Sequence, residues 1–234
     1  MQWSALLRGL GMTIAGVLAP TIIYYYARNE IDEMISFARQ AVKFLGLFIA
    51  LPVGLVSGLA KPLLLVWLGP DFVSLAPLML IMTVHLCLNL GYLPLNNIAT
   101  ATNHVRVPGI VQIFVGVINL ILAIFLAGPA GWGMYGVAAA GGIVLIFRNI
   151  IFTPYYGALI LGRRSSTFMK ELLPIVFMGA LVTCVNWFIV DYVDLASWTR
   201  LISYSFVFSL LYITVIFFML NSNEKHLIRK LLNI

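Results

Sequence analysis

Charged residues are scarce in this chain. They make up 9% of its 234 residues, against 62% hydrophobic residues, and the mean hydropathy is +1.03. A water-soluble domain carries about a quarter of its residues as charged side chains, so this composition excludes a surface that faces mainly water. The apolar runs are long and unbroken rather than alternating, which favours membrane-spanning helices over barrel strands. We therefore expect an all-α, polytopic membrane helix bundle that forms a single transmembrane domain over residues 1–234.

Residues that carry catalysis or hold metals are also missing. The two cysteines, Cys87 and Cys184, lie inside apolar runs and lack metal-ligand spacing. The sequence contains no phosphate-binding loop, no GxSxG turn and no HExxH motif. We therefore expect no enzyme, no cofactor and no metal site. A net charge of +6 would suggest a nucleic-acid partner for a soluble protein. Here the basic residues stand at the ends of apolar runs, so they indicate topology instead and no nucleic-acid partner is expected.

Seven apolar runs are long enough to cross a bilayer, which takes about 20 residues in a helix. Turn-forming residues separate several of them, as in Gly69-Pro70-Asp71 and Gly128-Pro129-Ala130-Gly131. The first run lacks a basic n-region and a cleavage pattern, so it is interpreted as a span and not as a signal peptide. The predicted spans cover residues 4–26, 43–60, 73–95, 107–127, 135–160, 172–190 and 201–220.

Lys and Arg residues indicate the orientation, because cytoplasmic loops collect them. Ten lie on the side of the C-terminus, and only Lys61 and Arg200 lie in the alternate loops. We therefore expect a cytoplasmic C-terminus and, with seven spans, an N-terminus outside. Residues 221–234 are predicted to form a cytoplasmic amphipathic tail on the anionic leaflet, with a frayed terminus as the alternative. The ten basic residues are Arg28, Arg39, Lys43, Arg106, Arg163, Arg164, Lys170, Lys225, Arg229 and Lys230.

Ionisable residues inside a span are costly and mark candidate functional positions. The predicted spans contain two arginines and no carboxylate, which argues against a proton or sodium relay through a buried acid in this segment. Arg148 lies near the middle of its span, and Ala138, Gly141 and Leu145 precede it on one helical face. Small residues mark helix contacts, so we predict that Arg148 faces the bundle or a wet cavity. In such a cavity the guanidinium would suit an anion such as phosphate. Alternatively, backbone carbonyls could satisfy the guanidinium, or the side chain could snorkel toward the membrane surface.

The other polar residues of the spans have plainer alternatives. Arg8 lies close to the outer end of the first span, where snorkelling is easy, although small residues continue its face. Histidine and asparagine residues inside spans more often form interhelical hydrogen bonds than ligand contacts. Prolines inside spans often serve as hinges in transporters. The candidate substrate contacts are Arg148, Arg8, Asn119, Asn89 and His85, and the candidate hinges are Pro20 and Pro52.

Several short motifs, in their order along the chain, resemble a known family. A helix ending in Ala19-Pro20 precedes a polar and basic segment at 30–44, and Trp-Leu-Gly-Pro-x-Phe follows at 67–72. A later span contains Asn119, and Gly-x-x-Gly-x-Ala-Ala comes next at 133–139. This arrangement resembles the C-terminal half of the polysaccharide or O-antigen flippases (Wzx-like) of the MOP superfamily, relatives of the MATE exporters and the lipid II flippases. The resemblance covers essentially the whole chain.

The resemblance implies a function and partners. In a fourteen-helix member with a cytoplasmic N-terminus, helix eight enters from outside and helix fourteen ends inside, as the basic residues indicate here. It implies a flippase in a prokaryotic cell membrane that moves a polyprenyl-pyrophosphate-linked oligosaccharide to the outer leaflet, with Arg148 and Arg8 as contacts for the charge. Alternating access needs two halves. The chain would then belong to a longer or truncated product, act with a separately encoded N-terminal half, or form a homodimer.

Two other functions stay open. A MATE-like multidrug exporter of cations would require an acidic cavity, which the arginines and the absence of buried carboxylates oppose. A non-transporting, truncated membrane fragment is the third interpretation. A start outside the membrane without a signal sequence suggests that an upstream segment is missing, and this favours a fragment or a split protein over a complete transporter.

Overall fold

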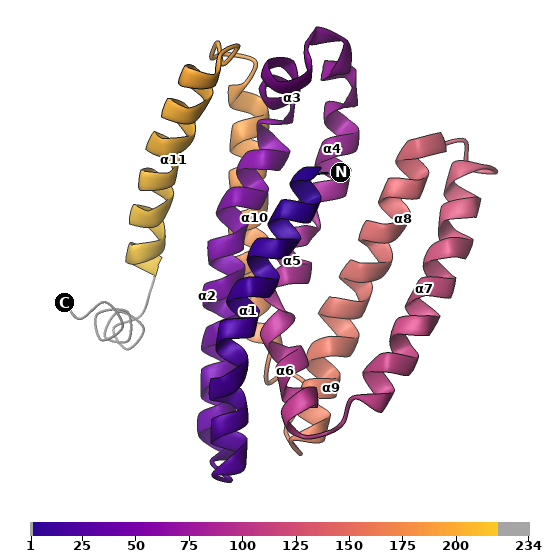
Figure 1. Cartoon of the computed structure of the whole chain (residues 1–234), viewed down its shortest axis with the longest axis vertical. Coiled ribbons are helices and arrows are strands. Elements are labelled where there is room, and N and C mark those ends of the chain that lie inside the picture. Colours follow the sequence, from indigo (N-terminus) through magenta and orange to yellow (C-terminus); the bar gives the residue numbers. More distant parts are fainter. Residues whose placement is uncertain (1, 220–234) are drawn as a thin grey trace. The chain divides into compact units, whose positions relative to one another are not determined.

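The computed structural model describes residues 2–219, and this range consists of helices and connecting loops without a strand (Figure 1). Seven of its helices are long and apolar enough to cross a membrane. They confirm the expected all-α, polytopic membrane bundle. The predicted tail at 221–234 lies outside the described residues. The candidate spans are Gln2–Ala27, Ile31–Gly58, Pro70–Gly91, Arg106–Ala127, Gly133–Ile160, Met169–Ile189 and Trp198–Phe218.

The chain forms two compact units, one up to Val193 and one from Asp194 onward. The described part of the second unit contains α11 (Trp198–Met219). All the other helices belong to the first unit. They are α1 (Gln2–Ala27), α2 (Ile31–Gly58), α3 (Ala60–Leu68), η1 (Pro70–Leu75), α4 (Ala76–Val84), α5 (Leu86–Gly91), α6 (Leu93–Ala101), α7 (Arg106–Ala127), α8 (Gly133–Phe147), η2 (Arg148–Phe152), α9 (Thr153–Ile160), η3 (Met169–Glu171) and α10 (Leu172–Ile189).

The second helix begins at Ile31 and not near residue 43, so the prediction of a basic loop before this span is wrong. Acidic residues such as Asp32 stand in its first turn, where a negative charge is favourable to the helix dipole. Met34 is completely buried one turn further on. Arg39 lies on the helix itself and pairs with Glu171, with 2.8 Å between Nη2 and Oε1. Charged side chains that are typical of a loop therefore form the amphipathic end of α2.

The span predicted over 73–95 is a series of short helices that continues to Ala101. Pro94 stands in the first turn of α6 and lacks the N–H that would continue the preceding helix. The earlier break, at His85, follows Thr83, whose hydroxyl donates to the carbonyl of Met79 at 2.7 Å. Such a side-chain bond to the preceding turn competes with the helical pattern and bends helices. The break leaves His85 at the junction of α4 and α5.

Glycines allow α2 to lie unusually close to α10 in the core. A Cβ atom on Gly54 would lie 2.5 Å from Cγ1 of Val182. A Cβ atom on Gly58 would lie 2.5 Å from Cβ of Asn186 and 2.8 Å from the backbone oxygen of Thr183. Small residues that let helix backbones approach are a common basis of packing within membranes. The α2–α10 pair therefore depends on these glycines.

Ion pairs connect both ends of α10 to the segment formed by α2 and α3. Arg163, before α10, pairs with Asp32 in the first turn of α2. At the opposite end Lys61 of α3 pairs with Asp191, just after α10, with 2.8 Å between Nζ and Oδ1. Exposed pairs of this kind contribute little stability individually. Their positions nevertheless show that both ends of α10 are tied to the α2–α3 segment.

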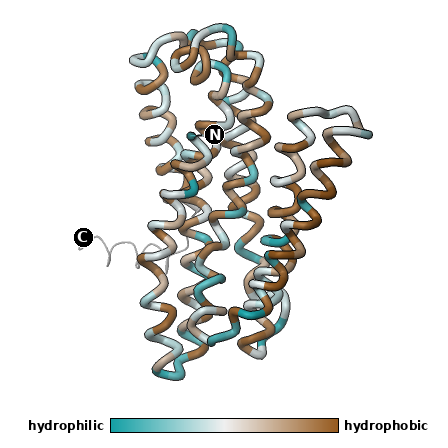
Figure 2. Tube along the Cα trace, turned by 45° about the vertical axis from the view of Figure 1, so that its right-hand side comes forward, coloured by the Kyte–Doolittle hydropathy of each residue, from teal (hydrophilic) through white to brown (hydrophobic). Residues whose placement is uncertain are grey.

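Hydrophobic residues predominate along the spans (Figure 2), and many of their large side chains are exposed. The extreme case is α7, which packs against α8. Its residues Ile113, Phe114 and Ile124 are each more than 60% exposed. A helix that is apolar around most of its circumference suits the hydrocarbon of a bilayer. The exposed faces of α7 are therefore suited to contact with lipid.

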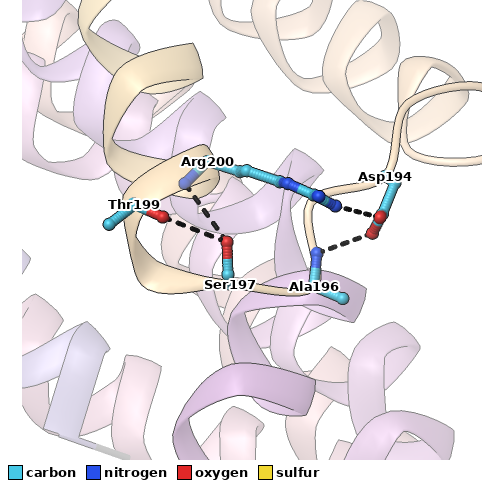
Figure 3. Close-up of polar contacts among 5 residues, drawn as sticks. All are labelled: Asp194, Ala196, Ser197, Thr199 and Arg200. Carbon is cyan, nitrogen blue, oxygen red and sulfur yellow. Dashed lines mark hydrogen bonds and ion pairs between the residues drawn. The ribbon is translucent and has the colours of Figure 1, made fainter.

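In the second unit, a polar cluster fixes the start of α11 (Figure 3). Ser197 Oγ accepts a hydrogen bond from the backbone N–H of Arg200 at 3.4 Å, the pattern of a helix N-cap. The Asp194 carboxylate accepts the N–H of Ala196 at 3.1 Å and pairs with the Arg200 guanidinium. That N–H, and then the charge of Arg200, hold the pKa of Asp194 below its ordinary value. Arg200 thus belongs to the first turn of α11, and its charge is partly balanced there.

Candidate binding cavity

A cavity of about 600 Å³ lies in the first unit between α1, the α4–α5 junction and α8. This volume is within the range of ligand-binding sites. Most of the wall is apolar, with Leu78 and Met82 of α4 on one side and Val137 of α8 on the other. Cationic and polar groups are few, so each one matters for what the cavity can bind.

The cavity brings together two residues that are far apart in the sequence, Arg8 on α1 and His85 at the α4–α5 junction. Both are among the predicted substrate contacts. His85 is 7% exposed. Gly142 lies opposite it on α8, where a Cβ atom would be 3.4 Å from the imidazole ring. The absence of a side chain at this position lets α8 approach the histidine closely.

Arg8 is not neutralised by the protein. It forms no hydrogen bond or ion pair with any other residue of the range 2–219. No acidic residue is among those that line the cavity in the described part of the chain. A guanidinium is always charged and presents several donors in a fixed plane. The cavity therefore offers an uncompensated positive charge within a mostly apolar wall.

Arg148, the main candidate from the sequence, is not on the wall of this cavity. Ala138, Gly141 and Leu145 line it, and Arg148 continues their face one turn further along the helix. It is half-buried, and its Nε has no hydrogen-bond partner among the described residues. The helix widens at this point into the π-turn η2, a feature that often occurs at functional positions. Its proposed contact with substrate stays a prediction.

Asn89 takes part in a buried amide network that joins α5 to η2 and α9. The side-chain amide of Asn149 donates to Asn89 Oδ1 at 2.8 Å, and the hydroxyl of Thr153 donates to Asn149 Oδ1 at 3.2 Å. This is the interhelical bonding named as the alternative for Asn89. Asn149 and Thr153 were missed in the sequence, although their i, i+4 spacing next to an arginine in an apolar run is a usable signal.

The remaining candidates lie away from the cavity wall. Asn119 on α7 faces α8, with its Oδ1 3.8 Å from the position of a Cβ atom on Gly141. Asn119 itself is not among the residues that line the cavity. Both α1 and α2 continue as helices through Pro20 and Pro52. A hinge role for these prolines stays a prediction.

Seven long apolar helices define this chain as a multi-pass α-helical membrane protein, and the first unit contains a cavity between α1, α4 and α8. A curated relative is EpsK of Bacillus subtilis (strain 168), described as an uncharacterized membrane protein. The two are 36% identical over 225 residues, which cover 96% of this chain and 45% of the relative. The chain therefore spans about half the length of the relative it matches. No family model matches the chain. No solved structure matches it either.

Proposed function

We propose that this chain is part of a transporter that flips a polyprenyl-pyrophosphate-linked oligosaccharide across the cell membrane. The observation that carries the proposal is the unpaired Arg8 in a cavity without acidic lining. An arginine at the centre of a span costs about 2.5–3.5 kcal/mol. The cost is smaller for Arg8, which lies nearer the end of α1, but its charge has no partner among the described residues. A ligand that carries a diphosphate would supply the missing negative charge and bidentate acceptors.

The chemistry of the cavity favours an anionic ligand over a cationic one. A cation would meet the charge of Arg8 at the wall, and the described lining residues include no carboxylate to offset it. His85 adds a second hydrogen-bonding group that can donate to phosphate oxygens. The same features suit binding and passage of a ligand, and we accordingly propose transport and not catalysis.

The resemblance to the C-terminal half of the Wzx-like flippases supports the same proposal. The chain corresponds to 45% of a relative that is described as a membrane protein. Alternating access requires two halves that move against each other. The proposed transporter is therefore the assembly that contains this segment, either in one longer chain or with a separately encoded half.

We further propose that the end of the bundle that carries Arg106, Arg163 and Arg164 faces the cytoplasm, as the distribution of basic residues indicates. In a background without Cys87 and Cys184, Arg164→Cys should resist a membrane-impermeant thiol reagent in intact cells. Asp71→Cys, near the opposite end, should react readily because it is exposed. The reverse pattern of labelling would contradict this orientation.

The function itself is tested by reconstitution. The native protein would be purified from its own membranes through a tag on this segment, which retains any further part or partner. In liposomes that contain undecaprenyl-pyrophosphate-linked oligosaccharide, it should expose the inner-leaflet glycan to an external glycosidase. Protein-free liposomes and liposomes with an unrelated seven-helix protein serve as controls. Glycan exposure no faster than in these controls would refute the proposal.

A further inference from the structure

A second cavity adjoins the one that contains Arg8. It has a volume of about 400 Å³ and lies between the start of α1, the end of α3 and the start of α4. Two indole side chains, Trp3 and Trp67, line it. The two cavities have three wall residues in common, Ser4, Leu78 and Met82. A single ligand could therefore occupy both, with one part in each.

We propose that this second cavity is a sugar subsite, which holds the first pyranose ring of the glycan while the diphosphate lies beside Arg8. The inference rests on the proposed function, because that function supplies a ligand in which an anionic group is directly joined to a sugar. It goes further in assigning a separate part of the ligand to Trp3 and Trp67. Neither tryptophan was a candidate in the sequence.

The arrangement of the indoles suits a sugar ring. The ring centroids of Trp3 and Trp67 are 5.6 Å apart with an angle of 81° between the planes. In such an edge-to-face pair only one face of one ring is covered by the other ring. The C–H faces of pyranoses pack on the faces of aromatic rings, and indoles combine that apolar face with a polar N–H. Gln2 and Ser4 also line the cavity and can hydrogen-bond to sugar hydroxyls.

The depth of the second cavity favours the sugar over the isoprenoid chain. Trp3 precedes Arg8 by five residues, which places it about 7.5 Å closer to the start of α1. Trp67 stands in the last turn of α3, and Leu75 immediately precedes α4. The second cavity is thus nearer the helix ends, on the aqueous side of Arg8. In a lipid-linked glycan the sugar lies on the aqueous side of the diphosphate and the apolar chain lies on the membrane side.

A binding experiment separates this subsite from the diphosphate site. The native protein, purified through a tag on this segment together with any further part or partner, would be placed in lipid nanodiscs. It would be titrated with undecaprenyl pyrophosphate and with the same lipid carrying one glucose, galactose or N-acetylglucosamine. Wild type should bind at least one glycosylated lipid more tightly than the bare one. Trp3→Leu and Trp67→Leu should each weaken that binding by about three- to tenfold. Binding of bare undecaprenyl pyrophosphate should stay within twofold of wild type.

Three variants make the result specific. Trp3→Phe and Trp67→Phe keep an aromatic face and should retain most of the preference for the glycosylated lipid. Trp132→Leu serves as the matched control, because Trp132 is 54% exposed and lines neither cavity. Its binding of all four lipids should equal that of wild type.

The outcomes distinguish this inference from the proposed function. Equal affinity of wild type for bare and glycosylated lipids would overturn the sugar subsite while leaving the diphosphate site intact. If the tryptophan variants weaken the binding of bare and glycosylated lipids equally, the second cavity would be assigned to the isoprenoid chain. This result would also overturn the sugar subsite. If wild type binds neither kind of lipid, the proposed function fails together with the subsite.

Discussion

Replacement of Arg8 by alanine should weaken the binding of undecaprenyl pyrophosphate by about ten- to a hundredfold, because a charge-assisted hydrogen bond contributes about 1.5–3 kcal/mol. Arg8→Lys keeps the charge but loses the planar fork, so it should retain part of the affinity. The measurement is the dissociation constant in nanodiscs, combined with the rate of flipping in liposomes. The variant that loses more affinity should also lose more of the flipping rate, so Arg8→Ala should flip more slowly than Arg8→Lys.

The control for Arg8 is Arg106→Ala, because Arg106 is exposed at the start of α7 and lines no described cavity. Its affinity should equal that of wild type. If Arg8→Ala binds undecaprenyl pyrophosphate as tightly as wild type, Arg8 does not contact the diphosphate and the proposed function loses its main support. Arg148 provides an informative comparison, since it lies one turn beyond Leu145 and off the cavity wall. Arg148→Ala should lower flipping more than Arg148→Lys, and a loss of flipping with intact binding would assign Arg148 to a later step of the crossing.

The second large effect is expected at Gly58, on the contact between α2 and α10. In Gly58→Ala the new Cβ atom would lie 2.8 Å from the backbone oxygen of Thr183 and 2.5 Å from Cβ of Asn186. Neither atom can move aside without moving α10, so the helices must separate. Overpacking of this kind costs about 1–3 kcal/mol. Thermal unfolding in detergent, followed by intrinsic fluorescence, should show a clearly lower midpoint for this variant.

Two other glycines make the test of Gly58 specific. Gly116→Ala on α7 should have an unfolding midpoint equal to that of wild type or slightly higher. Nothing lies within 4 Å of the new Cβ atom, and alanine favours a helix more than glycine does. Gly46→Ala should also lower the unfolding midpoint, since its Cβ atom would overlap Cδ1 and Cγ1 of Ile175, a β-branched side chain that is completely buried. If Gly58→Ala and Gly116→Ala unfold at the same temperature, the close approach of α2 and α10 does not stabilise the bundle.

The sequence predicts an all-α bundle with seven apolar helices because a helix that faces lipid must be apolar over its whole length, whatever its neighbours are. That local rule is sufficient for α7, whose predicted span 107–127 nearly coincides with Arg106–Ala127. It is insufficient at the start of α2, where Asp32 and Arg39 have their charges balanced by Arg163 and Glu171. Those partners are more than a hundred residues away in the chain, so no local pattern reveals them.

The same distinction applies to the candidate site. The cost of an ionisable side chain in a span identifies Arg8 and Arg148 from the sequence alone. Their surroundings depend on which helices pack together, and this is a tertiary property. The break at His85 brings that residue to the Arg8 cavity, whereas the network of Asn149 takes Asn89 into a buried contact. Local spacing cannot distinguish these two outcomes for residues on one helical face.

The contact between Gly142 and His85 has a consequence for engineering the cavity. The imidazole ring and the position of a Cβ atom on Gly142 are 3.4 Å apart, so alanine would fit there at ordinary contact distance. A larger side chain would have to displace α8 or the histidine. Position 142 therefore acts as a spacer that sets the distance between two walls of the cavity. Graded substitutions at this position would change the size of ligand that the protein accepts while leaving the charge of Arg8 in place.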